Sequence, residues 1–258
     1  MTYEKKRVLL TVKAYPEKSA KYGACVCTAG ITDNGELIRL YPIPFENFRG
    51  GKKLRKYSWI TVECEKASEY LERKESYKVR YSTINVENEL TTGPNGTWSD
   101  RNRVVLPVMS KSLESLEQMT AIDHTSLGLI KPREIMDFTI DSKADANGEE
   151  EEILKEVQMT LDGEPRTDLE NIGYNFRYHF YCMGENCRGH NIMCEDWEML
   201  ESWRKWKKRY RDRETFLERF KQAYLDKMRS KDLHFFVGTH SRFNTWLIIG
   251  LYYPPKVN

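Results

Sequence analysis

The stretch ACVCTAGITDNGELIRLYPIP, residues 24–44, consists of two β-prone runs joined by a short polar turn. The turn is Asp33-Asn34-Gly35, and an Asn-Gly pair tolerates the positive φ angles that tight hairpins require. The flanking runs are rich in apolar and β-branched residues, as expected of paired strands. This stretch therefore predicts a β-hairpin, and it sets the architecture expected of the first third of the chain.

Further strands are predicted on both sides of this hairpin. Residues 7–15 (RVLLTVKAY) and 75–87 (ESYKVRYSTINVE) are β-prone, and residues 59–67 (WITVECEKA) alternate with a period of two. Several short strands separated by turn signals are typical of a small barrel or a strongly twisted sheet. We expect residues 1–92 to form a β-rich domain, a small barrel of the OB or PUA-like kind.

The middle of the chain is predicted to be helical. Residues 91–103 have the composition of a loop. A helix is expected from Ser110 or Ser112, because serine is a favoured N-cap, and a second helix is expected over residues 131–140. Residues 104–140 therefore form a helical connector, and residues 141–152, with four consecutive glutamates, form an acidic linker.

The last hundred residues alternate between the two kinds of element. Strands are predicted at 175–182 and 190–194, and a helix from Asp196 onward, where apolar residues recur every three or four positions. A second helix fits residues 214–229, and the apolar runs near the C-terminus predict two closing strands. We expect an α+β domain over residues 153–258 and an α+β fold class for the chain.

Composition limits the class of protein. Hydrophobic residues make up 40% of the 258 residues and charged residues 31%, which is typical of a soluble globular protein. The start MTYEKKRVLLTVKAYP has no apolar run long enough for a signal core or a membrane span. We therefore expect a cytoplasmic protein without a membrane partner. Thiols stay reduced in that compartment, so the six cysteines do not imply three disulfides.

Three of the cysteines cluster with a histidine. The pattern Cys182-x4-Cys187-x2-His190-x3-Cys194 offers four ligands, the number that a structural zinc ion takes in tetrahedral geometry. CRGH resembles a zinc knuckle, in which Gly189 permits the tight turn. The alternative is a hairpin with partly buried cysteines and a solvated histidine. The spacing matches no standard zinc signature.

Motifs along the whole chain resemble those of a family of uncharacterised prokaryotic proteins of about this length. The motifs are RLYPIPF within residues 37–45, EDWE at 195–198, and FFVGT at 235–239 followed by LIIGLYYPP at 247–255. The resemblance implies that EDWE belongs to the family pattern and that the cysteines are a local addition. It also implies a setting in genome defence or nucleic-acid metabolism.

The EDWE motif permits two interpretations. Asp196 is a natural helix N-cap, and Glu198 in the first turn is favoured by the helix dipole. Alternatively, Asp196 and Glu198 are oxygen ligands for Mg²⁺ or Mn²⁺ and His190 is a general base. The second interpretation describes a divalent-metal-dependent nuclease.

Charge is distributed unevenly although the net charge is only +2. Residues 201–213 carry seven basic side chains interleaved with aromatic ones. The aromatic spacing favours a buried stripe, which leaves the cations free to contact phosphates. The candidate contacts on this helix are Arg204, Lys205, Lys207, Lys208, Arg209 and Arg211. The loop residues His240 and Arg242, and the strand residues Arg39 and Tyr41, are further candidates for nucleic-acid contacts.

Some enzyme classes have no support in the sequence. It contains no glycine-rich phosphate loop and no GxSxG nucleophile motif. The leading hypothesis is a nucleic-acid-binding protein with a structural zinc site at Cys182, Cys187, His190 and Cys194. The alternative is the nuclease described above. A third hypothesis is an interaction module whose charged surfaces bind a partner protein.

Overall fold

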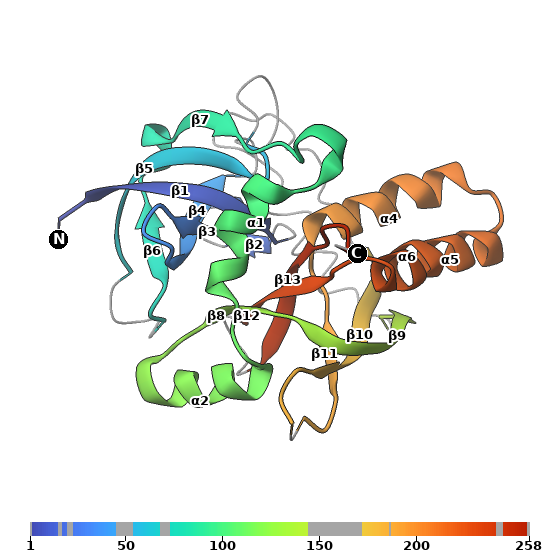
Figure 1. Ribbon diagram of the computed structural model, residues 1–258. Coiled ribbons are helices and arrows are strands. Elements are labelled where there is room, and N and C mark those ends of the chain that lie inside the picture. Colours follow the sequence, from blue (N-terminus) through green and yellow to red (C-terminus); the bar gives the residue numbers. More distant parts are fainter. Residues whose placement is uncertain are drawn as a thin grey trace.

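A computed structural model describes residues 2–14, 17–19, 23–44, 54–67, 73–143, 172–185, 187–240 and 245–256 (Figure 1). Strands dominate the first part of the chain, and a mixture of helices and strands follows. The predicted α+β class is confirmed. Within these ranges, no helix is long and apolar enough to cross a membrane.

The N-terminal part folds into a closed barrel, as the sequence predicted. Its strands follow the order β1-β3-β4-β6-β5, and β5 returns to pair with β1. β4 and β6 are parallel, and the other neighbours are antiparallel. The barrel strands are β1 (Glu4–Lys13), β3 (Gly23–Thr32), β4 (Leu37–Pro44), β5 (Ser58–Lys66) and β6 (Ser76–Val79). Outside this ring, β2 (Glu17–Ser19) pairs with β3, and β7 (Asn85–Glu89) pairs with β5.

The predicted hairpin of residues 24–44 is formed by β3 and β4. Its turn closes with a 2.9 Å hydrogen bond from Gly35 N to Thr32 O, and Gly35 has a φ of 81°. Alternate side chains of the strands, such as Val8 and Leu10 of β1, are fully buried inside the barrel.

Two predictions for the middle of the chain were wrong. Helix α1 (Ser99–Val105) begins inside the loop expected at 91–103, and the helix expected at 131–140 is strand β9 (Pro132–Ser142). β9 pairs with β10 (Tyr174–Cys182) along its whole length. Strand pairing of this extent overrides a local helical preference.

The predicted connector 104–140 is therefore helical only as far as α2 (Leu113–Asp123). α2 begins where the sequence predicted, because the Ser112 side chain accepts a hydrogen bond from Ser115 N. Strand β8 (Leu127–Ile130) follows it. Of the predicted acidic linker, residues 141 and 142 end β9, and residues 144–152 lie outside the described residues.

The C-terminal part contains two three-stranded sheets, β11-β10-β9 and β13-β12-β8. Only Lys131 separates β8 from β9, so the two form one bent strand. At the opposite edges, Cys194 forms a parallel bridge to Ile248, and Glu195 N donates to Ile248 O at 2.7 Å. These contacts close the two sheets into a second ring. Its other strands are β11 (His190–Met193), β12 (His234–Thr239) and β13 (Trp246–Tyr252).

The two rings share one topology. In each, the first strand pairs with the second and the fourth, and the third lies parallel to the fifth. This is the arrangement of a five-stranded Greek-key barrel of the OB type. In the C-terminal ring, β8–β9 acts as the first strand, and a helical segment connects the third strand to the fourth. The segment comprises α4 (Trp197–Arg209), α5 (Arg213–Lys221), a π-helical turn (Gln222–Asp226) and α6 (Lys227–Arg229).

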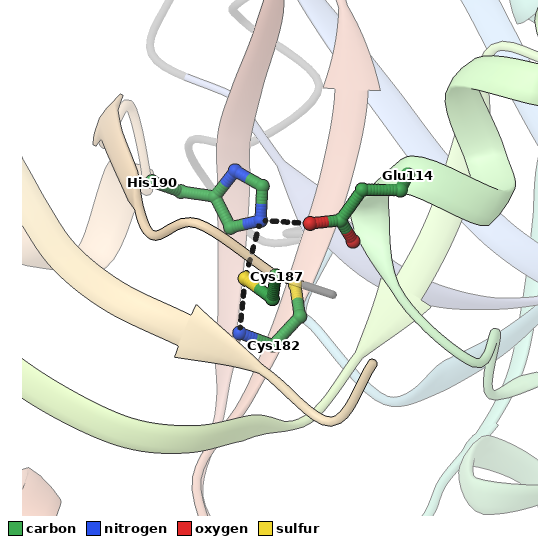
Figure 2. Close-up of side chains that lie close together, drawn as sticks. All are labelled: Glu114, Cys182, Cys187 and His190. Atoms are coloured by element: carbon green, nitrogen blue, oxygen red, sulfur yellow. Dashed lines mark hydrogen bonds and ion pairs between the residues drawn. The ribbon is translucent and has the colours of Figure 1, made fainter. Parts of the chain in front are cut away.

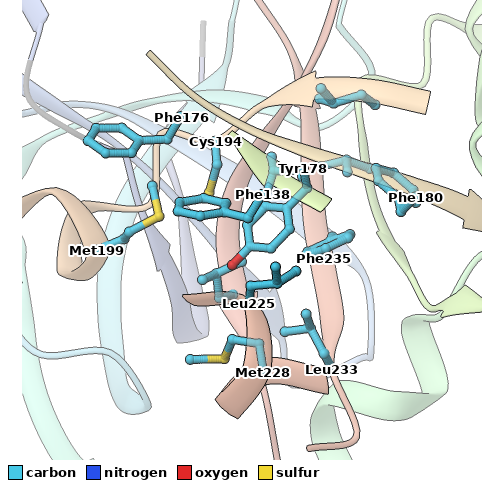
Figure 3. Close-up of a cluster of buried hydrophobic side chains, with 14 of the residues drawn as sticks. Phe138, Phe176, Tyr178, Phe180, Cys194, Met199, Leu225, Met228, Leu233 and Phe235 are labelled. Atoms are coloured by element: carbon cyan, nitrogen blue, oxygen red, sulfur yellow. The ribbon is translucent and has the colours of Figure 1, made fainter. Parts of the chain in front are cut away.

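Among the described residues, three apolar cores hold these parts together. One fills the N-terminal barrel, and another joins the C-terminal sheets to α4 and α5. Figure 3 shows part of the latter, where Phe138, Phe176 and Tyr178 pack near Met199 of α4. The third core lies between β1 and β13, so the barrels pack directly against each other.

Candidate metal centre and charged helix

The turn between β10 and β11 has the form of the predicted knuckle. Cys187 N donates to Gly184 O at 3.2 Å, and Gly189 adopts a φ of 92°. A Cβ atom at Gly189 would also lie 3.1 Å from the Tyr181 ring. Glycine at this position therefore permits the turn that brings Cys187 and His190 together.

Four potential ligands converge beside this turn (Figure 2). They are Cys182 at the end of β10, Cys187 in the turn, His190 at the start of β11, and Glu114 in the first turn of α2. One ligand atom from each lies within 4.8 Å of the others. His190 Nε2 is 3.2 Å from Cys187 Sγ and 3.1 Å from Glu114 Oε1. Thiols, an imidazole and a carboxylate are the usual ligands of zinc in proteins.

Cys194 does not belong to this group, which corrects the predicted ligand set. It follows His190 by four residues along an extended segment, so their Cα atoms lie about 13 Å apart at ~3.3 Å per residue. Its side chain is only 1% exposed and packs in the C-terminal core. Burial also raises the pKa of the Cys194 thiol well above its usual range.

Glu114 occupies the fourth position because α2 docks against the knuckle. Gly184 approaches α2 so closely that an added Cβ would lie 3.3 Å from Ser112 Cβ. Leu113 N points at Cys182 Sγ, at 3.4 Å, across 69 positions of sequence. No sequence pattern links residues so far apart, so Glu114 was missed. In contrast, a rise of about 3.3 Å per residue along a strand places Cys194 too far from His190 for the two to bind the same metal ion.

The electrostatics of the group suit a cation. Burial is the main cause that raises the pKa of Cys182 to about 12, so without a metal its thiol stays protonated. For Glu114, burial opposes ionisation, but the donors around its carboxylate, which are its own N–H, Ser112 and Cys187, hold the pKa below its usual value. Glu114 Oε2 is buried and has no hydrogen-bond partner among the described residues. A divalent cation would satisfy this oxygen and deprotonate the thiols.

The acidic residues of EDWE lie in a different environment. Asp196 caps α4, because its Oδ1 accepts from Met199 N at 2.9 Å, and its Oδ2 accepts from Leu251 N at 3.0 Å. Lys56 Nζ, which the sequence did not indicate, lies 3.2 Å from Asp196 and 3.3 Å from Glu198. Burial opposes the charge of Lys56, but the two carboxylates raise its pKa well above the usual value.

His190 is therefore not brought together with Asp196 and Glu198. It lies in the group that contains Glu114, and within the described residues Asp196 and Glu198 belong to no group of three or more potential ligands. Asp196 acts as the helix cap that the sequence indicated.

Helix α4 separates its aromatic and basic side chains. Trp203 is buried against Phe176, Phe216 and Phe220, and Trp206 and Tyr210 pack at the edge of the same core. Arg204 pairs with Glu201 at 3.0 Å. The remaining predicted contacts, Lys205, Lys207, Lys208, Arg209 and Arg211, are exposed.

Two of the other predicted contacts, Arg39 and His240, bond to residues that are far away in the sequence. Arg39 is buried, and its Nη2 donates to Ser126 O at 3.0 Å. Tyr41 is half-buried on β4, and the carbonyl of His240 accepts a hydrogen bond from Arg73. Arg242 lies outside the described residues.

Comparisons with known proteins follow the division between the barrels. Residues 4–107, which contain the first barrel and α1, match the family model described as Domain of unknown function (DUF8758). No curated protein matches the chain. Residues 109–258, more than half of the chain, match the model described as Domain of unknown function (DUF8757), and the chain belongs to this family.

Proposed function

We propose that this protein binds nucleic acid through the exposed basic side chains of α4 and the following turn. The observation that carries the proposal is the separation of charges from rings on this helix. Its aromatic side chains pack into the core, and Lys205, Lys207 and Arg209 face solvent. Cations presented in this way neutralise phosphates and release counterions.

The barrels add support by analogy. OB-type barrels commonly bind oligonucleotides. A fold alone does not assign a function, so the proposal rests on the charged surface. A setting in genome defence or nucleic-acid metabolism agrees with this proposal and is part of it.

The test is a titration of fluorescently labelled single-stranded 20-mers of DNA and RNA, followed by anisotropy at several salt concentrations. Wild-type protein should bind, and its affinity should fall steeply with salt. The triple variant Lys205→Gln, Lys207→Gln, Arg209→Gln should lower the salt slope by about 2, since each phosphate contact on a single strand contributes about 0.7.

A matched control removes the same charge elsewhere. Lys5, Lys111 and Lys143 are exposed and lie outside α4, so their replacement by glutamine should leave the salt slope unchanged. No binding by wild-type protein at low salt would refute the proposal, and so would equal losses in both triple variants.

The proposal includes a structural zinc ion held by Glu114, Cys182, Cys187 and His190. Its fit rests on the ligand types, on their mutual distances below 4.8 Å, and on the unpartnered Oε2 of Glu114. An ion with four protein ligands has no open position for substrate, so it would be structural. It would fasten α2 to the β10–β11 hairpin.

Elemental analysis of the purified protein tests the zinc site. We expect one zinc per chain in the wild type and in Cys194→Ser, and little zinc in Cys187→Ser or Glu114→Gln. Cys194→Ser is the matched control, because it makes the same chemical change outside the group. Zinc lost equally from both cysteine variants would contradict this ligand set.

A further inference from the structure

A second group of charged and aromatic side chains lies where the N-terminal barrel, α1, α4 and the end of β13 meet. Lys56 contributes ion pairs to Asp196 and Glu198, and the rings of Trp98 and Tyr253 lie 5.5 Å apart. We refer to this group as the junction cluster. It comprises Lys56, Tyr57, Trp98, Arg101, Glu198 and Tyr253.

The cation at its centre forms no ion pair among the described residues, although it lies close enough to Glu198 to help lower the pKa of that carboxyl. Arg101 is only 8% exposed, and its guanidinium carbon lies 3.9 Å from the centre of the Tyr57 ring and 4.9 Å from that of Trp98. Its Nε donates to Leu90 O at 2.7 Å. Within the described residues no carboxylate forms an ion pair with Arg101. A buried charge of this kind is costly unless it is paired, so the site favours an anionic ligand.

The two rings beside Arg101 are held in strained backbone conformations. Tyr57 has a φ of 66° and Trp98 a φ of 59°, and bulky residues seldom adopt this left-handed region. Their rings contact each other edge to face at 6.0 Å. Such strain persists only where the surrounding structure holds the backbone in place, and it is found most often at ligand sites.

Arg101 is the cation that the carboxylates of this cluster leave to a ligand. Lys56 contacts both Asp196 and Glu198, and within the described residues neither carboxylate forms an ion pair with Arg101. The Glu198 side chain is nevertheless 49% exposed, so part of its carboxylate can accept hydrogen bonds from a ligand.

We propose that the junction cluster binds a nucleotide. The base stacks on the partly exposed rings of Trp98 and Tyr253, and its N–H groups donate to Glu198. The phosphate pairs with Arg101. A nucleotide combines an aromatic ring, N–H donors and an anion, so it matches the exposed rings, the Glu198 carboxylate and the Arg101 cation. Stacking of bases on aromatic side chains is a common mode of recognition.

The proposal deepens the proposed function where the nucleotide belongs to a bound strand. Glu198, Ser202, Lys205 and Arg209 follow one another at spacings of four, three and four, so they share one face of α4. Eleven residues of helix span about 16 Å. A strand whose phosphates contact the basic end of α4 can therefore place a nucleotide at Glu198.

Isothermal titration of the full chain with the four ribonucleoside 5′-monophosphates tests the site, with ribose 5-phosphate as the probe that lacks a base. At least one nucleotide should bind more tightly than ribose 5-phosphate. Trp98→Ala should weaken it by about tenfold or more, the loss expected of one base stack. Arg101→Gln should weaken it by a similar factor, because it removes the cation that pairs with the phosphate. Arg103→Gln is the control, because Arg103 is exposed on the same helix and pairs with Asp100 at 3.1 Å.

Circular dichroism verifies that each variant is folded, and Arg101→Lys replaces Arg101→Gln if the latter is not. Lysine keeps the charge but loses the planar stack, so it should also weaken binding. No nucleotide binding by the wild type would overturn the inference, and so would unchanged binding in a folded Arg101 variant.

The labelled 20-mers identify the source of the nucleotide. If Arg101→Gln weakens both the 20-mers and the monophosphates, the nucleotide belongs to a bound strand. If it weakens only the monophosphates, the ligand is a free nucleotide, and the junction cluster stands apart from the basic surface. Wild-type protein that binds monophosphates but no 20-mer would refute the proposed function alone, and the reverse result would overturn this inference alone.

Discussion

At the scale of single residues, replacing Lys56 tests how much its buried ion pairs stabilise the junction between the barrels. The Lys56 side chain is 3% exposed and contacts Asp196 and Glu198. Lys56→Met leaves a buried carboxylate without its cation, so we expect a loss of about 3–5 kcal/mol in the free energy of unfolding, measured with urea. Adding Asp196→Asn should restore part of it, because asparagine still caps α4 through its Oδ1, whereas its Nδ2 cannot accept the hydrogen bond that Leu251 N donates to Asp196.

Lys221→Met is the control, since Lys221 forms a surface ion pair with Asp137 at 2.8 Å in which both side chains are exposed, and it should cost at most about 1 kcal/mol. The pH dependence gives a second readout. Burial opposes the charge of Glu198, but Lys56 and other cations lower its pKa below 4.5. Its contribution is thus present above pH 4.5 and is lost as the pH falls through the lowered value. Lys56→Met should lose less stability than the wild type over this acid range.

The metal ligands show how far single residues can be predicted from sequence. Cys182, Cys187 and His190 lie within nine positions, and a tight turn suffices to gather them. The prediction of Cys194 as a metal ligand was wrong, because the length of strand β11 separates it from His190. Glu114 and Lys56 reach their partners only through tertiary packing, which leaves no local pattern.

At the scale of elements, α2 links its own N-cap to the metal centre. Ser112→Ala removes the cap, which should cost about 1 kcal/mol of stability. It should also weaken zinc binding by about tenfold, the lower end of the effect of residues that orient a metal ligand, because Ser112 holds the turn that carries Glu114. Competition with a chromophoric chelator measures the zinc affinity.

Asp212→Ala provides the comparison. Asp212 caps α5 by accepting from Thr215 N at 2.7 Å, and it has no contact with the metal centre. This variant should destabilise α5 and leave the zinc affinity unchanged. A zinc affinity unaltered in Ser112→Ala would mean that Glu114 is not positioned by the cap.

Helices and strands could be predicted from the sequence where a repeating pattern of apolar residues was sufficient to identify them. The period-two alternation identified the N-terminal strands, and the three-to-four spacing identified α4 and α5. β9 was missed although residues 136–141 of its sequence, PREIMDFTIDS, alternate between apolar and polar side chains, a pattern typical of a strand. Pairing with β10 fixes its strand conformation: Phe138 lies opposite Tyr178, and both side chains are fully buried.

At the scale of the whole molecule, the sequence predicted the first barrel but not the second. The C-terminal ring closes through the bend at Lys131 and the bridge between Cys194 and Ile248. Both are long-range features that no sequence window contains. The N-terminal ring was easier to predict, because its first strands are neighbours in sequence and are joined by a recognisable turn.

The core between the barrels predicts that the chain unfolds as one unit. Leu9 and Val12 of β1 share this core with Leu129, Phe236 and Ile249 of the C-terminal ring. Neither barrel can unfold without exposing apolar surface of the other. Urea transitions followed by circular dichroism and by tryptophan fluorescence should therefore coincide in the wild type.

Two phenylalanines distinguish this coupling from simple loss of stability. Phe236 is buried in the core between the barrels and Phe180 in the C-terminal core, and replacing either by alanine should cost about 3–5 kcal/mol. Only Phe236→Ala removes a contact across the interface, so only in this variant should the two transitions separate. Separate transitions in the wild type would show that the barrels are independent. The junction cluster would then lie between two bodies free to move, a poor setting for the fixed geometry that nucleotide binding needs.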